Sequence, residues 1–515
     1  MKRSSKVSIG LTVAGAFFSV AVSSAQNAGN WTTYRNDAGR AGVQKNENSI
    51  TKESLAKDFK FLWKLKLGND AGNFRSYSEP LLIFRLINAQ GFKDFVIWSD
   101  RQNIYAVDSE LGKLLWKKQA DAAPPACAAS NMAMTLEPPL VINFGARRAP
   151  GQRPPTPAGP LSVHDRRIGV AAGGGGFGLK GLYWLSADGM LHEQVVTTGA
   201  DFAQPVKFLP GDVGIGKGMG INGKMLYTTT ASGCAGAKNA LYMVDMTTPS
   251  YPVSVYDSKS VPLLTTMSPT LSDGAAILVT GKGASDEPAG VHANSVVAVA
   301  PDAKVKGWYE AGGPLRNVTP VAFTYKEKKL VVAPGKNGAL VLLDAEAPGG
   351  ADHHTALAEA ALGGSSGTMA ADALTVWQDA ASGTTWVFAS VHGAVSPSAK
   401  FATKDGAASH GSVAAFKVED DGGKLSLSPQ WVSKDMVNPA PPVVANGFVI
   451  ALAQGSAQVP AKLLVLDSAS GKELYSSGKE IPTYAQMAGI SVGDGHVFFV
   501  THDNTLYSFG IGIEH

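Results

Sequence analysis

The sequence is poor in cysteine and in charge, and it has no long apolar run beyond its first residues. Two of its 515 residues are cysteine, 17% are charged, and the formal net charge is +3. No basic cluster follows the N-terminal residues, so a nucleic-acid-binding surface is not expected. The sequences His-Glu-x-x-His, Cys-x-x-Cys and Cys-x-x-Cys-His are absent, which excludes the commonest zinc-protease, dithiol-redox and haem-attachment motifs.

The N-terminal residues have the pattern of a secretory signal. A basic start is followed by the apolar run Val7–Val22 and by the small residues Ser23–Ala25. This order predicts a signal peptide over residues 1–25 and a mature chain over residues 26–515. An uncleaved membrane anchor is the alternative, but serine, threonine and glycine interrupt the run, which is short for a span. We therefore expect a periplasmic or secreted protein with no membrane span after cleavage.

The two cysteines, Cys127 and Cys234, are far apart in the sequence. In an oxidising compartment we expect them to pair, and two buried free thiols are the alternative. A disulfide would close a loop of about a hundred residues and stabilise the fold by roughly 4–5 kcal/mol in the chain-entropy model.

Glycine and proline number 58 and 29, and this composition suits many strands joined by turns. A hairpin pattern recurs among them. Tyr105–Asp108 is a short apolar strand that ends in aspartate, and Gly112–Trp116 follows as a glycine-lysine turn and a return strand with an aromatic residue. Leu464–Asp467 and Gly471–Tyr475 repeat this order. A recurring unit predicts a repeat fold more strongly than any single turn does.

The hairpin and a preceding apolar strand form a module that occurs eight times, and the shortest modules have the length of a four-stranded propeller blade. In the second module, we expect Glu137–Val141 to be the first strand. The last hairpin strand, Leu506–Phe509, has no return strand after it, whereas Phe61–Lys64 looks like a return strand without a hairpin. The sequence therefore predicts an all-β, eight-bladed β-propeller closed by the N-terminal strand. Several separate β-sandwich domains are the alternative.

These hairpins resemble the pyrroloquinoline-quinone (PQQ) repeat, on the residues Tyr105–Asp108 with Gly112–Trp116 and Leu464–Asp467 with Gly471–Leu474. The resemblance covers nearly the whole mature chain and implies a propeller of the quinoprotein alcohol dehydrogenase type, in which the hairpin aromatics dock between blades. Related propellers include dehydrogenases that use PQQ and Ca²⁺, and non-enzymatic scaffolds such as the lipoprotein of the outer-membrane β-barrel assembly machine. This chain lacks the adjacent cysteine pair and the haem domain of those dehydrogenases.

The resemblance also places a quinone in the central funnel, near the starts of the innermost strands. The candidate cofactor-binding residues flank those starts and carry carboxylate, amide or guanidinium groups: Arg75, Glu79, Glu137, Arg316, Asn317 and Asn438. Such oxygens suit Ca²⁺, and arginine suits a quinone carbonyl or carboxylate. Asp435 is the candidate general base, taking the alcohol proton as hydride leaves. The alternative is structural, because polar residues at strand starts also satisfy backbone groups. No metal-ligand set is assigned.

Two functions from different classes agree with these observations. The first is an exported binding or scaffold protein, with a partner protein or a small-molecule ligand at the funnel mouth. The second is a soluble PQQ-dependent oxidoreductase that acts on an alcohol or sugar, with PQQ and Ca²⁺ as cofactors and an external electron acceptor. The missing cysteine pair and the missing haem motif favour the first function.

Overall fold

A computed structural model describes residues 29–68, 77–88, 91–125, 127, 131–136, 181–210, 218–234, 236–264, 268–284, 290–363, 373–485 and 489–512. The predicted signal peptide, Arg75 and Glu137 lie outside the described residues. Within the described residues, no helix is long and apolar enough to cross a membrane.

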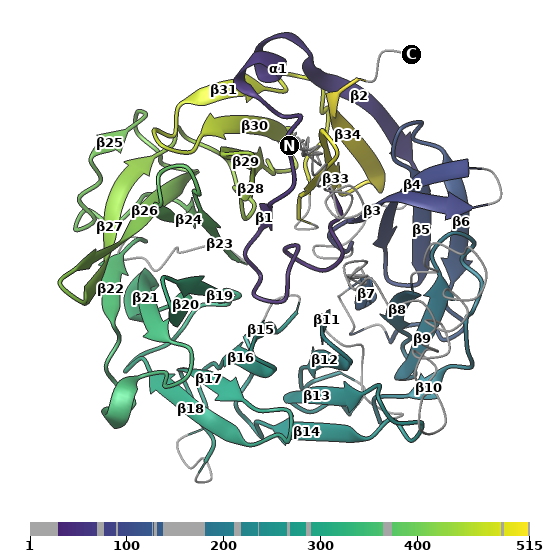
Figure 1. The fold of residues 1–515 in the computed structure, drawn as a ribbon, viewed down its shortest axis with the longest axis horizontal. Coiled ribbons are helices and arrows are strands. Elements are labelled where there is room, and N and C mark those ends of the chain that lie inside the picture. Colours follow the sequence, from purple (N-terminus) through teal and green to yellow (C-terminus); the bar gives the residue numbers. More distant parts are fainter. Residues whose placement is uncertain are drawn as a thin grey trace, which may run out of the picture.

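The strands form eight sheets that are arranged as the blades of a ring (Figure 1). This confirms the predicted all-β, eight-bladed β-propeller. Blade 1 comprises β3 (Leu81–Asn88), β4 (Gly91–Ser99), β5 (Asn103–Asp108) and β6 (Leu114–Gln119), and blade 2 comprises β7 (Met134–Leu136), β8 (Gly181–Leu185), β9 (Met190–Val195) and β10 (Val206–Lys207). Blade 3 comprises β11 (Met219–Asn222), β12 (Met225–Thr230), β13 (Ala240–Asp245) and β14 (Val253–Asp257), and blade 4 comprises β15 (Thr270–Ser272), β16 (Ala275–Val279), β17 (Ser295–Val299) and β18 (Val305–Glu310).

The remaining blades include the two strands from the start of the chain. Blade 5 comprises β19 (Val321–Tyr325), β20 (Lys328–Pro334), β21 (Ala339–Asp344) and β22 (Ala358–Ala361), and blade 6 comprises β23 (Leu374–Gln378), β24 (Thr385–His392), β26 (Gly411–Asp421), β27 (Lys424–Val432) and β25 (Thr403–Lys404). Blade 7 comprises β1 (Val43–Gln44), β28 (Val443–Ala445), β29 (Phe448–Ala453), β30 (Lys462–Asp467) and β31 (Glu473–Ser476), and blade 8 comprises β32 (Ser491–Gly493), β33 (His496–Val500), β34 (Thr505–Ile511) and β2 (Phe59–Lys66). The described helical segments are α1 (Lys52–Lys57), η1 (Lys336–Gly338) and η2 (Gly350–Asp352).

The described first strand of blade 2 is β7 (Met134–Leu136), and its Met134 pairs with Trp184 of β8. These residues come just before the predicted strand Glu137–Val141 in the sequence. Residues 137–141 lie outside the described residues.

The ring is closed by one strand from the N-terminal part of the chain, β2, and one from the C-terminal part, β34. Strand β2 pairs antiparallel with β34, from Phe59 opposite Ile511 to Lys66 opposite Thr505. It is the outer strand of blade 8, in the sheet order β2-β34-β33-β32. This pairing covers the edge of β34 that the C-terminal part of the chain leaves open.

Tryptophans of outer strands join neighbouring blades. The Nε1 of Trp116 in blade 1 donates to the carbonyl of Val196 in blade 2, over 2.8 Å. The Nε1 of Trp63 in blade 8 donates to Ser109 of blade 1 over 3.0 Å, and that of Trp431 in blade 6 donates to Ser468 of blade 7 over 2.9 Å. Each indole ring also packs against a glycine that lies three residues after the acceptor in the neighbouring blade: Gly199 for Trp116, Gly112 for Trp63 and Gly471 for Trp431. The hairpin aromatics therefore dock between blades, as the resemblance implied.

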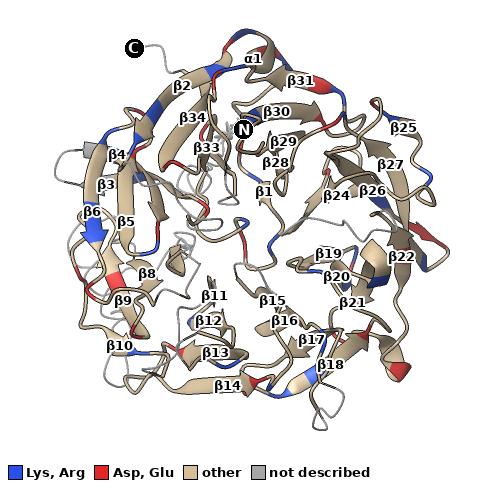
Figure 2. Ribbon diagram, turned by 180° about the vertical axis from the view of Figure 1, so that it is seen from behind, with Lys and Arg blue, Asp and Glu red and all other residues tan. Residues whose placement is uncertain are grey.

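Charged residues lie mainly on outer strands and connecting loops, and the inner strands are largely uncharged (Figure 2). A disulfide joins Cys127, in the connection from blade 1 to blade 2, to Cys234, in the loop between β12 and β13. Both connections lie on the face at which the first strand of each blade begins, which we call the strand-start face.

Candidate functional site

The centre of the ring is occupied by the protein's own N-terminal segment. We call residues 29–44 the plug segment; it includes β1 and crosses the middle of Figure 1 in purple. Its backbone binds the first strands of blades 1, 2, 4, 5, 6 and 7 in turn, through Trp31, Thr32, Ala38, Gly39, Ala41 and Gly42. The side chain of Gln44 reaches blade 8 at the carbonyl of Val492, over 3.0 Å.

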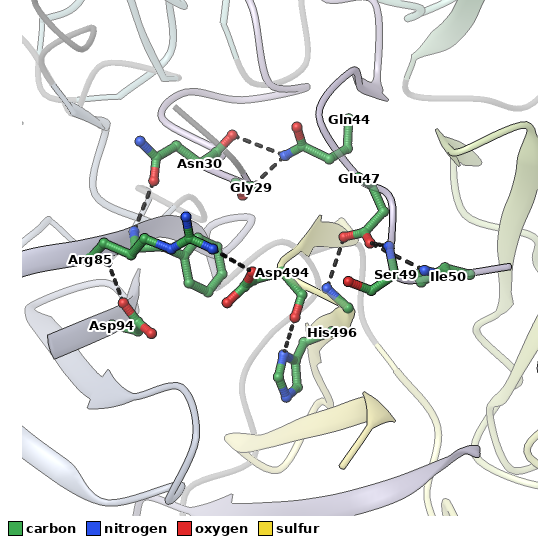
Figure 3. Close-up of polar contacts among 12 residues, drawn as sticks. Gly29, Asn30, Gln44, Glu47, Ser49, Ile50, Arg85, Asp94, Asp494 and His496 are labelled. Carbon is green, nitrogen blue, oxygen red and sulfur yellow. Dashed lines mark hydrogen bonds and ion pairs between the residues drawn. The ribbon is translucent and has the colours of Figure 1, made fainter. Parts of the chain in front are cut away.

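Hydrogen bonds hold the base of the plug segment near the turn between β32 and β33 (Figure 3). This turn follows the first strand of blade 8, so it lies on the face opposite the strand starts. The Nε2 of Gln44 donates to the carbonyls of Gly29 and Asn30, each over 3.0 Å, so the two ends of the segment are held together. Just beyond it, Glu47 accepts from the backbone amides of Ser49 and Gly495. The plug segment is therefore a loop that enters the channel from this face and returns to it.

Arg35 anchors the tip of the plug segment to blades 6 and 7. Its side chain is 1% exposed. Its Nη2 donates to Oγ1 of Thr375 over 2.6 Å and to the carbonyl of Pro442 over 2.5 Å, and its Nη1 donates to the carbonyl of Pro441 over 3.4 Å. The planar fork of arginine suits this fan of acceptors.

Arg40 makes the equivalent anchor to blade 4. It is fully buried, its Nη2 donates to Oγ of Ser268 over 2.6 Å, and its Nε donates to the carbonyl of Pro269 over 3.0 Å. Burial lowers the pKa of Arg40 to about 10, so it remains protonated at neutral pH. The cationic groups in the channel are thus bound by blade carbonyls and hydroxyls close to the strand starts.

Glu79, a predicted cofactor ligand, binds the plug segment. Its Oε1 accepts from Nε1 of Trp31 and from the backbone N–H of Arg35, both over 2.7 Å. Burial raises the pKa of Glu79 to about 7, although the charge of Arg35 partly offsets this. Its Oε2 has no hydrogen-bond partner in the described part of the chain.

A small cavity lies beside Glu79, where blades 1, 2 and 3 meet the plug segment. Its lining includes Tyr34, Glu79, Asn131, Met132, Met134 and Met219, and its volume is about 20 Å³. Asn131 is buried, and within the described ranges its Nδ2 is also without a partner. The cavity therefore has mainly apolar walls, with the polar residues Glu79 and Asn131 in its lining.

Asp435, the predicted general base, lies in the connection from blade 6 to blade 7 and is paired with a histidine. Its Oδ2 lies 2.6 Å from Nδ1 of His410, and its Oδ1 accepts from the backbone N–H of His410 over 2.8 Å. Partial burial opposes ionisation, but the bonds from His410 hold the pKa of Asp435 below its ordinary value. The sequence did not indicate His410 as its partner, because that residue lies in an insertion outside the repeat.

The other described candidate residues lie in the connections that lead into blades 5 and 7. Arg316 is exposed and Asn317 is half-buried, both in the connection from blade 4 to blade 5. Asn438 is exposed, and its Nδ2 donates to the carbonyl of Gly455 over 2.8 Å. Its side chain thus supports a loop of blade 7.

Among the described residues, one group of carboxylates is close enough to hold a cation. Oxygens of Asp94, Glu110 and Asp494 lie within 4.8 Å of one another. Glu110 and Asp494 lie in the turns between β5 and β6 and between β32 and β33, on the face opposite the strand starts. Arg85 lies between Asp94 and Asp494 in Figure 3. Arg85 donates its backbone N–H to Asp94, and its Nη2 lies 3.7 Å from Oδ1 of Asp494. This group is thus partly neutralised by an arginine and is distant from the predicted quinone position.

The structure is similar to a quinohemoprotein alcohol dehydrogenase from Pseudomonas putida HK5, with a TM-score of 0.56 and 11% identity over 96% of this chain and 82% of that chain. It is also similar to a europium-containing methanol dehydrogenase, with a TM-score of 0.54 and 11% identity over 94% of this chain and 98% of that chain. No protein-family model and no curated protein matches the sequence. At this identity the likeness concerns the fold alone, an eight-bladed β-propeller.

Proposed function

We propose that the chain is an exported binding or scaffold propeller that contacts a partner protein or a small-molecule ligand through its strand-start face. The observation that carries the proposal is the plug segment. Its tip reaches the level of the strand starts, where Arg35 and Arg40 bind carbonyls of blades 4, 6 and 7. Glu79, which faces the same region, is engaged by Trp31 and Arg35. Arg35, Arg40 and Glu79 therefore hold the plug segment to the blades. A ligand or partner would accordingly bind the loops of the strand-start face around them.

The test is a titration of the purified mature chain with PQQ and Ca²⁺, followed by quinone absorbance and by dye-linked oxidation of alcohols and sugars. An established quinoprotein dehydrogenase, reconstituted under the same conditions, is the positive control. We expect no change in quinone absorbance at micromolar PQQ and no turnover. A tight complex with turnover would overturn the proposal.

A PQQ-dependent oxidoreductase is the second candidate, and its support is the shared fold with two proteins whose names state dehydrogenase activity. The described candidate residues fit a quinone and Ca²⁺ site poorly, because Glu79 binds the plug segment and Asn438 binds Gly455. If turnover is nevertheless found, Asp435→Asn should abolish it without loss of quinone binding. Arg316→Gln changes another exposed candidate residue, a predicted cofactor ligand. Comparing quinone binding and turnover in the two variants would then separate cofactor binding from proton transfer.

Export is a separate part of the proposal. The basic and apolar N-terminal pattern supports a signal peptide over residues 1–25. We expect the mature protein to begin at Gln26, which N-terminal sequencing or intact mass measurement of protein from the exporting host would establish. A mass that includes residues 1–25 would contradict cleavage.

A further inference from the structure

The outermost strands of blades 8 and 1 are rich in lysine. Strand β2 carries Lys60, Lys64 and Lys66, β6 carries Lys117 and Lys118, and neither strand contains an acidic residue. The outermost strands of the other six blades together contain three lysines and four acidic residues: Lys207, Lys306, Lys404, Asp257, Glu310, Glu359 and Glu473. Positive charge is therefore concentrated on one part of the circumference of the ring (Figure 2).

Packing of blade 8 against blade 1 brings these lysines onto one surface. The Nε1 of Trp63 in β2 donates to the carbonyl of Ser109, in the turn before β6, over 3.0 Å. Both strands begin on the face opposite the strand starts, because β2 begins opposite Ile511 and β6 follows the turn after β5. We call the five lysines of β2 and β6, together with Lys113 of this turn, the basic rim. Its two parts are separate in the sequence, so no basic cluster is visible there.

Most of the charge of the basic rim is not neutralised within the fold. Lys66 lies 3.5 Å from Asp503, and Lys118 lies 3.0 Å from Asp201. Glu110, in the turn before β6, belongs to the carboxylate group described above. The other four lysines of the basic rim are exposed and form no ion pair with any described residue: Lys60, Lys64, Lys113 and Lys117.

Exposed leucines lie among these lysines. Leu111, Leu114 and Leu115, in the turn before β6 and in β6 itself, are 65%, 37% and 36% exposed. Lysine on an edge strand can prevent pairing with a strand of another molecule. Exposed leucine does not serve that purpose, and the edge strand β14 has no lysine. Lysine combined with exposed leucine is instead typical of surfaces that lie in the interface of an anionic membrane.

We propose that the basic rim docks the protein onto an anionic lipid bilayer, with the lysines near phosphate groups and the leucines in the interfacial layer. Strands β2 and β6 contain no arginine. Arginine is a planar fork that suits one carboxylate or phosphate, whereas lysine is a compact point charge. The composition therefore suits the diffuse charge of a bilayer better than a single acidic side chain of a partner protein. The inference does not depend on the proposed function, because the basic rim lies on the circumference and leaves the strand-start face open.

The test is sedimentation of the purified mature chain with vesicles of phosphatidylglycerol mixed with phosphatidylcholine, and with vesicles of phosphatidylcholine alone. We expect binding to the first and not to the second. Binding should be lost as salt is raised from about 0.05 to about 0.5 M, because salt screens exposed charges. In Lys60→Gln/Lys64→Gln/Lys113→Gln/Lys117→Gln the partition coefficient should fall by at least about 100-fold, since each lysine near an anionic surface contributes roughly fivefold.

The matched control removes the same charge from exposed lysines of blades 4, 5 and 6, in the variant Lys306→Gln/Lys336→Gln/Lys404→Gln/Lys424→Gln. It should bind as the wild type does. If circular dichroism shows that the fourfold variant of the basic rim is misfolded, Lys113→Gln/Lys117→Gln replaces it, with an expected loss of about 10-fold or more. No binding to phosphatidylglycerol vesicles, or equal losses in the rim variant and the control, would overturn the proposal.

A second variant distinguishes a bilayer from an acidic protein surface. Leu111→Gln/Leu115→Gln keeps every charge but removes the apolar groups that would enter the interfacial layer. Its partition coefficient should fall by about 5-fold or more, with the salt dependence of the wild type. Unchanged binding in this variant would mean that charge alone is recognised, as by an acidic partner protein, and would also overturn the proposal.

Discussion

At the scale of single residues, the channel depends on Arg35. Its guanidinium group satisfies the carbonyls of Pro441 and Pro442 and the hydroxyl of Thr375, all of them buried. In Arg35→Met the side-chain volume is roughly kept, but the Pro441 carbonyl and the Thr375 hydroxyl oxygen lose the donor that Arg35 supplies, whereas the Pro442 carbonyl keeps its bond from Oγ1 of Thr375. Each unsatisfied buried group costs about 1–3 kcal/mol, so the free energy of unfolding should fall by on the order of 3 kcal/mol or more.

Urea unfolding followed by tryptophan fluorescence measures this loss. Arg316→Met is the control, because Arg316 is exposed and surface changes usually stay within about 0.5 kcal/mol. Equal unfolding midpoints for the two variants would mean that Arg35 contributes no more than a surface arginine.

Glu79 makes stability depend on pH in the direction opposite to an ordinary ion-paired carboxylate. Burial raises its pKa from 4.5 to about 7 in the folded chain. Between these pH values the folded chain keeps a proton that the unfolded chain has released. The stability from this group is therefore complete below pH 4.5 and is lost as the pH rises towards 7.

The variant Glu79→Gln cannot release this proton and serves as the reference. In metal-free buffer, the wild type should lose about 3 kcal/mol more than Glu79→Gln between pH 4.5 and 7.5. Urea unfolding at several pH values across this window measures the difference. Parallel pH profiles for the two proteins would show that Glu79 has an ordinary pKa in the fold.

At the scale of elements, the contact of a tryptophan with a hairpin glycine sets how blades pack. Gly112 has φ +61°, and a Cβ there would lie 2.6 Å from the ring of Trp63. Gly422 has φ +58°, and a Cβ there would meet nothing within 4 Å. Alanine is strained at either position by about 1–2 kcal/mol, but only Gly112→Ala also displaces a ring, for roughly 1–3 kcal/mol more.

Thermal unfolding of Gly112→Ala and Gly422→Ala therefore separates backbone strain from blade packing. We expect a lower midpoint for Gly112→Ala, together with a changed Trp63 fluorescence environment. Indistinguishable midpoints would mean that the ring contact adds nothing to the cost of a left-handed alanine.

The blades could be predicted from the sequence because their signals are local and repeated. Asp108, Gly112 and Trp116 lie within one hairpin, and the same order recurs at Asp467 and Gly471. The plug segment could not be predicted, because its contacts are distant in the sequence and follow no repeat. The contact of Arg35 with Pro442, for example, spans 407 positions. The starts of the inner strands indicate the candidate site residues, and this pattern correctly locates Glu79 in the central region. It cannot indicate that Nε1 of Trp31 donates a hydrogen bond to the carboxylate of Glu79.

At the scale of the whole molecule, the disulfide between Cys127 and Cys234 ties the start of blade 2 to blade 3. The bonded residues are 107 positions apart, for which the chain-entropy model gives about 4–5 kcal/mol. The Cys127→Ser/Cys234→Ser variant should unfold at lower urea concentration than the oxidised wild type. Reductant should lower the wild-type midpoint to that of the variant and leave the variant unchanged. Two reactive thiols in the denatured, unreduced wild type would contradict the bond.

Ring closure by β2 is a property of pairing and not of chain order. Gly29 and Ile511 both contact the turn between β32 and β33, so the start of the plug segment and the end of β34 lie close together. A permuted chain that runs from residue 77 to residue 512, then through a short flexible linker into residues 29–66, can therefore form the same plug segment and the same β2–β34 ladder. We expect it to be monodisperse in size-exclusion chromatography and to melt within a few degrees of the wild type. A truncated chain of residues 77–512 leaves β34 as an apolar edge and empties the channel, so it should aggregate. If the truncated chain were as stable as the permuted one, the N-terminal residues would have no part in holding the ring together.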